Sequence, residues 1–223
     1  MDTAESKHVH LKSVPAIDYT ANSTTTNQII QREKSFDLVQ NLVQLISLKD
    51  KNTLEHSNRV YSITREWATS MRAKWQWIDL DVGALELAAL LHDVGKVGVL
   101  DEILLKPDAL TAIERDHLEQ HPEIGYQLIR DFPGISDIAQ GVRHHHERWD
   151  GRGYPLGLKE NQIPKIAQII SVVDTYDAIT SDRPYREGRT HELALLEIER
   201  EAGRQFSSEL VQDFLQFMHG RNT

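Results

Sequence analysis

Three consecutive histidines, His144, His145 and His146, are the residues of this chain most clearly able to do chemistry. A further histidine stands beside an aspartate, at His92 and Asp93. Imidazole nitrogens and carboxylate oxygens bind transition metals, so this density of both predicts a metal site rather than ordinary surface residues. The chain contains no cysteine, which excludes disulfides and thiolate ligands, so nitrogen and oxygen atoms must hold the metal.

Two aspartates stand where a carboxylate is costly without a partner. Asp174 ends the apolar run over residues 169–173, so it needs an ion pair or a metal. Neighbouring residues on a helix point about 100° apart, so His92 and Asp93 cannot easily chelate one ion. Asp93 has two oxygens, however, and could bridge two ions while His92 binds one. This arrangement predicts a binuclear centre with its ions roughly 3.5–4 Å apart.

The elements that position these groups have a helical pattern. Phe36, Val39, Leu42, Val43 and Ile46 recur at three- and four-residue steps, as one buried helix face requires. The same reading predicts helices over residues 55–74, 81–95, 111–121, 122–131, 135–146, 164–182, 190–203 and 207–219. The chain shows no alternating run long enough for a sheet and no internal repeat. The predicted fold class is therefore all-α.

Two local signals mark helix starts within this pattern. Thr111 and Glu114 have the spacing of a capping box. Pro122 suits the first position of a helix that starts just after His121. These signals divide the segment into the two predicted helices 111–121 and 122–131.

The chain divides into a leader and one domain. Residues 1–28 are polar and rich in Ser, Thr and Asn, and we expect a flexible leader there. Residues 29–223 are predicted to form one domain, since 39% apolar content is enough for one sizeable core.

Charge and hydropathy exclude several classes of partner. The net charge of -9 and the pI near 5.6 argue against a nucleic-acid polymer, which needs a broad basic surface. A small anionic ligand is allowed where metals and local cations reverse the field. The chain has no signal peptide and no apolar stretch of ~18 residues, so we expect no membrane contact and a cytoplasmic location.

Several short motifs follow one another in a fixed order. They occupy residues 56–60, 91–98, 106–107, 110–111, 121–125, 145–151, 153–155, 174–178 and 183–186. In these motifs, and over roughly residues 48–214, the chain resembles the HD-GYP family of cyclic di-GMP phosphodiesterases, a branch of the HD phosphohydrolases. The resemblance implies an HD-domain-like helical bundle with a Gly-Tyr-Pro loop over a metal site.

The resemblance also implies a set of metal ligands in which Asp93 is the bridge. The set is His56, His92, Asp93, His121, His145, His146 and Asp174. His56 and His121 enter it through the resemblance alone, because a lone helical histidine is more often structural. His144 is interpreted as a neighbour, since three successive imidazoles cannot all face one site.

Asn52 bears on the number of metals. Some family members hold a third metal through a glutamate four residues before the first histidine, where this chain has Asn52. The resemblance therefore favours two divalent ions here, and Glu55 differs in orientation by a helical step. Iron and manganese are favoured because the ligands combine imidazole and carboxylate, although this set also suits zinc.

The expected reaction is hydrolysis of cyclic di-GMP to pGpG and then, as an open question, to GMP. A hydroxide bridging two metals would attack phosphorus, and Lys96 would contact the phosphate and protonate the leaving 3′ oxygen. Arg183 and Arg186 would contact the second phosphate or a guanine, with a solvated basic patch as the alternative. Preference for 3'3'-cyclic GMP-AMP stays open, as does a catalytically silent cyclic-dinucleotide sensor or docking module.

The Gly153-Tyr154-Pro155 loop has two interpretations. It is a structural lid over the histidine pair, or a surface recognised by diguanylate cyclase (GGDEF) proteins, as the resemblance implies. Glu147 and Asp150 are expected to orient the imidazoles rather than to bind metal. A homodimer stays open beside a monomer.

Overall fold

A computed structural model describes residues 39, 41–71, 80–182 and 187–221, which leaves the predicted leader outside the described residues. This part of the chain is helical and contains no β-strand, so the predicted all-α class is confirmed. Residues 41–49 are helical and precede α2 Lys51–Met71, α3 Val82–Leu91, the 3-10 helix η2 Val94–Gly98, α4 Asp101–Leu104, α5 Ala112–Leu118, α6 His121–Ile129, α7 Ser136–His144, the 3-10 helix η3 Glu160–Gln162, α8 Lys165–Thr180, α9 His191–Arg200 and α10 Ser208–Arg221. Among the described helices, none has the length and apolar character needed to span a membrane.

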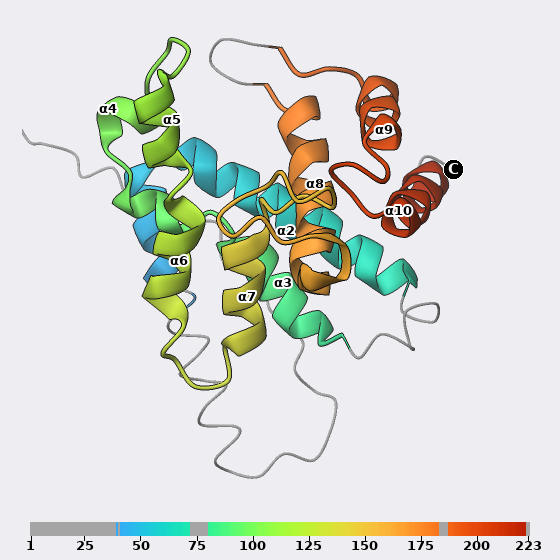
Figure 1. Ribbon diagram of the computed structural model, residues 1–223, viewed down its shortest axis with the longest axis horizontal. Coiled ribbons are helices and arrows are strands. Elements are labelled where there is room, and N and C mark those ends of the chain that lie inside the picture. The colour runs from blue at the N-terminus through green and yellow to red at the C-terminus, as the bar shows by residue number, and fades with distance from the viewer. Residues whose placement is uncertain (1–38, 40, 72–79, 183–186, 222–223) are drawn as a thin grey trace, which may run out of the picture.

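Four helices, α2, α3, α7 and α8, pack against one another around the core (Figure 1). α3 is buried on all sides from Leu85 to Leu91, which places it inside the bundle. α6 packs against α7 and η2, while α9 and α10 cover the other side of α8 (Figure 1). The loop between α7 and α8 crosses in front of both helices.

Gly141 allows α7 to lie close to two core helices. A Cβ atom at this position would stand 2.5 Å from Cγ2 of Ile166 and 2.9 Å from Cβ of Ala88. Such distances are too short for carbon atoms, so only glycine permits this approach. The close packing fixes the end of α7, where the histidine triplet lies.

α3 ends at Leu91, four residues before the predicted end of this helix at residue 95. The ring of His92 binds the carbonyl oxygen of Ala89, and the chain then turns into η2. Gly95 packs so tightly on α6 that a Cβ would lie 1.8 Å from the carbonyl oxygen of His121. α3 ends at Leu91 because the residues that follow it pack against α6.

Both of the predicted helix-start signals are found at helix starts. The capping box of Thr111 and Glu114 is present, and Pro122 lies in the first turn of α6, which begins at His121. α2 instead begins four residues before the predicted start at residue 55. Asp50 explains the difference, because its carboxylate accepts hydrogen bonds from the backbone amides of Asn52 and Thr53.

Candidate metal centre

The seven predicted ligands come from five places in the fold and meet in one cluster. α2 supplies His56, the segment after α3 supplies His92 and Asp93, α6 supplies His121, the segment after α7 supplies His145 and His146, and α8 supplies Asp174. Their ligand atoms form overlapping groups of three in which all atoms lie within 4.8 Å of one another. The structure therefore brings together every metal-ligand candidate that the sequence indicated.

The cluster has two halves joined by Asp93. One half consists of His56, His92 and Asp174, and the other of His121, His145 and His146. Oδ2 of Asp93 lies 3.4 Å from Nε2 of His92 and 3.8 Å from Nε2 of His56. Oδ1 lies 3.2 Å from Nε2 of His121. Each carboxylate oxygen thus faces a different half, as a bridging ligand requires.

Three of the imidazoles are held by main-chain carbonyl groups. The Nδ1 atoms of His92, His121 and His145 lie 2.8, 2.8 and 2.7 Å from the carbonyl oxygens three residues earlier. A carbonyl can only accept a hydrogen bond, so Nδ1 carries the proton in each ring. Nε2 is left as the atom with a lone pair, and it points into the cluster.

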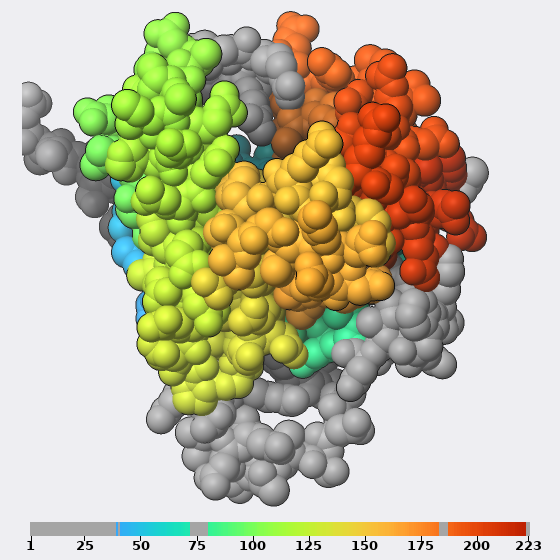
Figure 2. All heavy atoms as spheres, in the orientation of Figure 1, coloured from blue at the N-terminus to red at the C-terminus, as the bar shows by residue number. Residues whose placement is uncertain are grey.

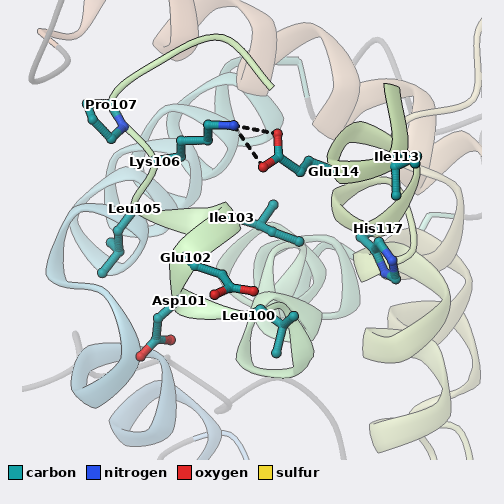
Figure 3. A pocket seen from close by; sticks show the side chains of 10 residues that line it. All are labelled: Leu100, Asp101, Glu102, Ile103, Leu105, Lys106, Pro107, Ile113, Glu114 and His117. Atoms are coloured by element: carbon teal, nitrogen blue, oxygen red, sulfur yellow. Dashed lines mark hydrogen bonds and ion pairs between the residues drawn. The ribbon is translucent and has the colours of Figure 1, made fainter. Parts of the chain in front are cut away.

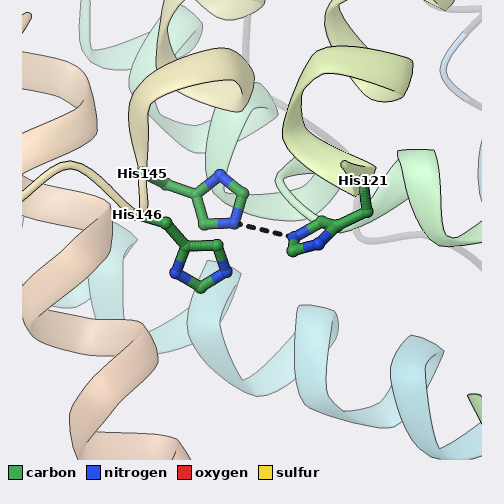
Figure 4. Close-up of side chains that lie close together, drawn as sticks. All are labelled: His121, His145 and His146. Carbon is green, nitrogen blue, oxygen red and sulfur yellow. Dashed lines mark hydrogen bonds between the residues drawn. The ribbon is translucent and has the colours of Figure 1, made fainter. Parts of the chain in front are cut away.

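These lone pairs make the cluster fit a cation. Nε2 of His121 lies 3.3 Å from Nε2 of His145 (Figure 4). Two neutral nitrogen acceptors so close together repel each other unless a proton or a metal lies between them. A donor set of imidazole and carboxylate without sulfur suits iron, manganese or zinc.

Burial favours the unprotonated form of His145 and His146 in the second half of the cluster. Desolvation lowers the pKa of His145 far below its usual value and lowers the pKa of His146 to about 3. Burial alone would raise the pKa of Asp93, but the neighbouring Lys96 ammonium and the imidazoles lower it well below its usual range. Neutral imidazoles and an ionised carboxylate are the forms that bind metal.

Asp177 contacts a candidate ligand, and the sequence reasoning gave it no role. Its Oδ2 lies 2.7 Å from Nδ1 of His56, and the guanidinium of Arg59 donates to both of its oxygens, at 2.7 and 3.0 Å. Asp177 is three residues beyond Asp174 on α8, so both carboxylates share the helix face that meets α2. That spacing was the available signal.

His56 carries an unusual charge environment. Burial alone would lower its pKa, but hydrogen bonds to Asp174 and Asp177 raise it to about 9. Asp174 Oδ1 lies 2.9 Å from Nε2 of His56, and this contact keeps the pKa of Asp174 below its usual value despite burial. Without a metal, both ring nitrogens of His56 therefore hold protons between two carboxylates.

Lys96 lies at the edge of the cluster, in η2. Its ammonium is 2.6 Å from Oδ2 of Asp93, and 23% of its side chain is exposed. The predicted placement one turn beyond Asp93 thus puts a cation beside the bridging carboxylate. Arg183 and Arg186, the other predicted substrate contacts, lie outside the described residues.

The Gly-Tyr-Pro loop is tied down by Glu147 and lies on the cluster. Buried Glu147 accepts hydrogen bonds from the amides of Leu156 and Leu158, at 2.7 and 3.0 Å. The Tyr154 ring packs on His146, with 4.8 Å between the centroids. The predicted role of Glu147 in orienting the ligand imidazoles is wrong, because its carboxylate is occupied by loop amides.

Two further expectations about this segment have different outcomes. Asp150 binds the guanidinium of Arg148, at 3.2 and 3.1 Å, rather than an imidazole, so its predicted orienting role is also wrong. His144 lies outside the three ligand groups and binds the side chain of Gln140, as expected for a neighbour.

Asn52 and Glu55 both lie on the exposed side of α2. Glu55 pairs with Lys51, 3.4 Å away, and takes no part in the ligand groups of the described residues. Neither residue therefore extends the cluster towards a third ion.

The surface is hollowed in two different places. Figure 2 shows a hollow between α5, in green, and the loop after α7, in gold, with part of α2 visible at its floor. A separate pocket of about 610 Å³ lies between α4 and α5, where the Lys106 ammonium binds both carboxylate oxygens of Glu114 (Figure 3). None of the seven candidate ligands lines this second pocket, so the 106–107 motif closes a structural contact there.

The chain matches known proteins over most of its length. A family model described as "HD domain" matches residues 40–210. A cyclic di-GMP phosphodiesterase of Thermotoga maritima is 38% identical over 182 residues, which cover 81% of this chain and 48% of that protein. A 3'3'-cGAMP-specific phosphodiesterase of Vibrio cholerae is 32% identical over 187 residues, which cover 83% of this chain and 35% of that protein. The chain thus spans half or less of the length of these relatives.

A solved structure has a similar arrangement of helices. The crystal structure of a cyclic GMP-AMP specific phosphodiesterase of Vibrio cholerae superposes with a TM-score of 0.55 at 19% identity. The match covers 80% of this chain and 48% of that one. At this identity the similarity concerns the fold, and it agrees with the helical bundle described above.

Proposed function

The chain belongs to the HD domain family, in its HD-GYP branch, and from this premise we propose that it is a metal-dependent phosphodiesterase acting on cyclic di-GMP. The product is pGpG, with further cleavage to GMP as a second step. The observation that carries the proposal is the sharing of Asp93 between two groups of imidazole and carboxylate donors. Such a site suits the hydrolysis of a phosphate diester.

We assign two divalent ions to the cluster, with iron or manganese favoured. Their proposed ligands are His56, His92, Asp93, His121, His145, His146 and Asp174. When bound, two such ions polarise phosphate oxygens and lower the pKa of a bound water from about 15.7 towards roughly 7. The exposed position of Asn52 supports two ions rather than three.

The protein's own residues contribute binding and proton transfer. Lys96 is close enough to Asp93 to reach a phosphate held at the cluster, and its ammonium has a proton for the leaving 3′ oxygen. As the oxygen of water bonds to phosphorus, the 3′ oxygen leaves with a proton, and the cyclic dinucleotide opens to a linear one. Arg183 and Arg186 remain predicted contacts for the second phosphate or a guanine.

Access to the cluster supports an enzymatic role. His56 and Asp174 each keep 16% of their side chain exposed, whereas His92 and His145 are fully buried. The cluster therefore opens to solvent at His56 and Asp174, and His146 in the other half is also only partly buried. A substrate that approaches from this side meets Lys96, which is also partly exposed.

Cyclic GMP-AMP is the alternative substrate within the same reaction class. The 32% identity to a 3'3'-cGAMP-specific enzyme supports this alternative. Both dinucleotides would present the same phosphates to the metal centre. A catalytically silent sensor or docking module is the alternative from another class. The complete ligand set argues against it, since a sensor has no need of seven metal ligands.

The cellular context is part of the proposal. We place the protein in the cytoplasm, where cyclic dinucleotides would be its substrates. Recognition of GGDEF proteins by Gly153-Tyr154-Pro155 remains a second role for that loop, and a homodimer remains an alternative to a monomer. The packing of Tyr154 on His146 supports the interpretation of this loop as a structural lid ahead of recognition of GGDEF proteins.

Product analysis tests the proposal. Reduced, manganese-loaded protein is incubated with cyclic di-GMP or with cyclic GMP-AMP, and the products are separated by chromatography. We expect pGpG from cyclic di-GMP, and background hydrolysis for Asp93→Asn, which removes the shared charge. If fully loaded wild type cleaves neither dinucleotide but binds one with an affinity insensitive to Asp93→Asn, the sensor interpretation replaces the enzyme.

A further inference from the structure

The two halves of the cluster differ in charge. We call His56, His92 and Asp174 the His56 half-site, and His121, His145 and His146 the His121 half-site. Asp174 gives the His56 half-site a carboxylate of its own, whereas the His121 half-site consists of three imidazoles. Asp93 contributes one oxygen to each, and Oδ2, the oxygen on the side of the His56 half-site, also pairs with the Lys96 ammonium. An ion in the His56 half-site still has one more carboxylate in its proposed ligand set than an ion in the His121 half-site.

The halves also differ in what lies behind the ligands. Backbone carbonyls hold His92, His121 and His145, while a carboxylate, Asp177, holds His56 at 2.7 Å. A carboxylate behind an imidazole makes the opposite ring nitrogen a stronger electron donor, and loss of such a partner typically weakens metal affinity 10–100-fold. Among the described residues, this support exists on one side of the cluster only.

Arg59 stabilises the buried carboxylate of Asp177. Only 3% of the Asp177 side chain is exposed, and an isolated carboxylate there would be costly. The guanidinium binds both oxygens, which fixes the plane of the carboxylate and aims Oδ2 at His56. Arg59 and His56 are three residues apart on α2, so one helix carries both partners of Asp177.

We propose that the two half-sites bind divalent metal unequally, and that Asp174 and Asp177 make the His56 half-site the tighter one. Asp177 is a positioning residue in this scheme, because it acts through His56 and not on the ion. The inference rests on the metal binding proposed above and adds an order of filling. The His56 half-site fills first, and under a chelator the His121 half-site empties first.

Titration of the metal-free chain with Mn²⁺ tests the order. Free Mn²⁺ is measured by its electron paramagnetic resonance signal, which requires no turnover. Wild type should bind in two steps whose dissociation constants differ at least tenfold. His146→Ala should lose the weaker step and keep the tighter one, and Asp174→Asn should lose the tighter step.

Asp177→Asn tests the positioning role against a matched control. Asparagine keeps the shape and removes the charge, so the tighter step should weaken about 10–100-fold while the weaker step stays unchanged. Asp150→Asn is the control, because Asp150 is also paired with an arginine but contacts no imidazole. Circular dichroism and thermal unfolding show whether each variant is folded, and a general structural defect would affect both steps.

The outcomes separate this inference from the proposed function. Equal steps in wild type, or an Asp177→Asn effect on the weaker step or on neither, would overturn the unequal half-sites and leave a binuclear enzyme. Wild type that binds no Mn²⁺ would overturn both. If Asp177→Asn does not fold, the His146→Ala and Asp174→Asn titrations still decide which half-site is tighter.

Discussion

Glu147→Gln should detach the Gly-Tyr-Pro loop from the bundle without removing any proposed metal ligand. The carboxylate of Glu147 is buried and accepts hydrogen bonds from the backbone amides of Leu156 and Leu158. A glutamine has one oxygen to accept a hydrogen bond, and its NH₂ group would face the second amide. One hydrogen bond would then have a neutral acceptor in place of a charged one, and the other would be replaced by a contact between two donors.

The cost follows from these two bonds. Hydrogen bonds to charged groups contribute about 1.5–3 kcal/mol each, and a buried donor without a partner costs about 1–3 kcal/mol. Exposed Leu156 lies at the surface, so water can rehydrate part of the released backbone. We therefore expect a loss of about 2–3 kcal/mol in the free energy of unfolding, which corresponds to roughly 4–12 °C in Tm.

Urea unfolding of the metal-free protein measures this loss without interference from ligand binding. The exchange rates of the Leu156 and Leu158 amides should also rise, by roughly thirtyfold for 2 kcal/mol. Glu160→Gln makes the same chemical change at an exposed position of the same loop and should stay within about 0.5 kcal/mol of wild type. Equal stabilities of the two variants would refute the idea that Glu147 anchors the loop.

Four further expectations concern packing, metal, protons and turnover. Gly141→Ala should cost about 1–2 kcal/mol in urea unfolding, because its Cβ meets Ile166, whereas Gly220→Ala has open space and should be neutral. Elemental analysis of anaerobically purified protein should give about two ions per chain, and a reproducible value near three would contradict the two-ion proposal. The raised pKa of His56, about 9 against 6.5 when unfolded, stabilises the metal-free fold fully below pH 6.5, and this contribution is lost as pH rises through 9. Unfolding of metal-free wild type and His56→Gln between pH 6 and 10 measures it, and a constant difference between them would contradict the assignment. Lys96→Ala should lower kcat about 10²–10³-fold with little change in KM, and unchanged steady-state kinetics would remove Lys96 from the mechanism.

Much of the fold could be predicted because helical periodicity and caps are local signals. Thr111 with Glu114 was a correct cap, and the α-helices from α2 to α10 follow the predicted ranges except for the short α4, which was not predicted. The end of α3 could not be predicted, because it depends on the contact of Gly95 with α6. Gly95 and His121 are 26 positions apart, so the local sequence pattern gives no sign of their contact.

The candidate metal ligands could be predicted from the sequence, but the residues that hold these ligands in place could not. Asp93 and Asp174 were indicated by carboxylates at the ends of apolar runs, and the family resemblance, confirmed by the matched HD domain, added His56 and His121. Asp177 escaped because its role appears only when α8 lies against α2. The expected roles of Glu147 and Asp150 were wrong because Glu147 lies beside His144, which is outside the ligand groups, and Asp150 pairs with Arg148.

The main-chain anchoring of three imidazoles limits how this site can be adjusted. The carbonyls of Ala89, Leu118 and Val142 belong to the last turns of α3, α5 and α7 and would otherwise lack a helical partner. No side-chain substitution can remove a backbone carbonyl, so the tautomers of these ligands are insulated from point mutation. His56 is the exception among these four rings, because a single codon change at Asp177 alters its electron donation. The fold thus holds three of these four rings constant and leaves one of them tunable.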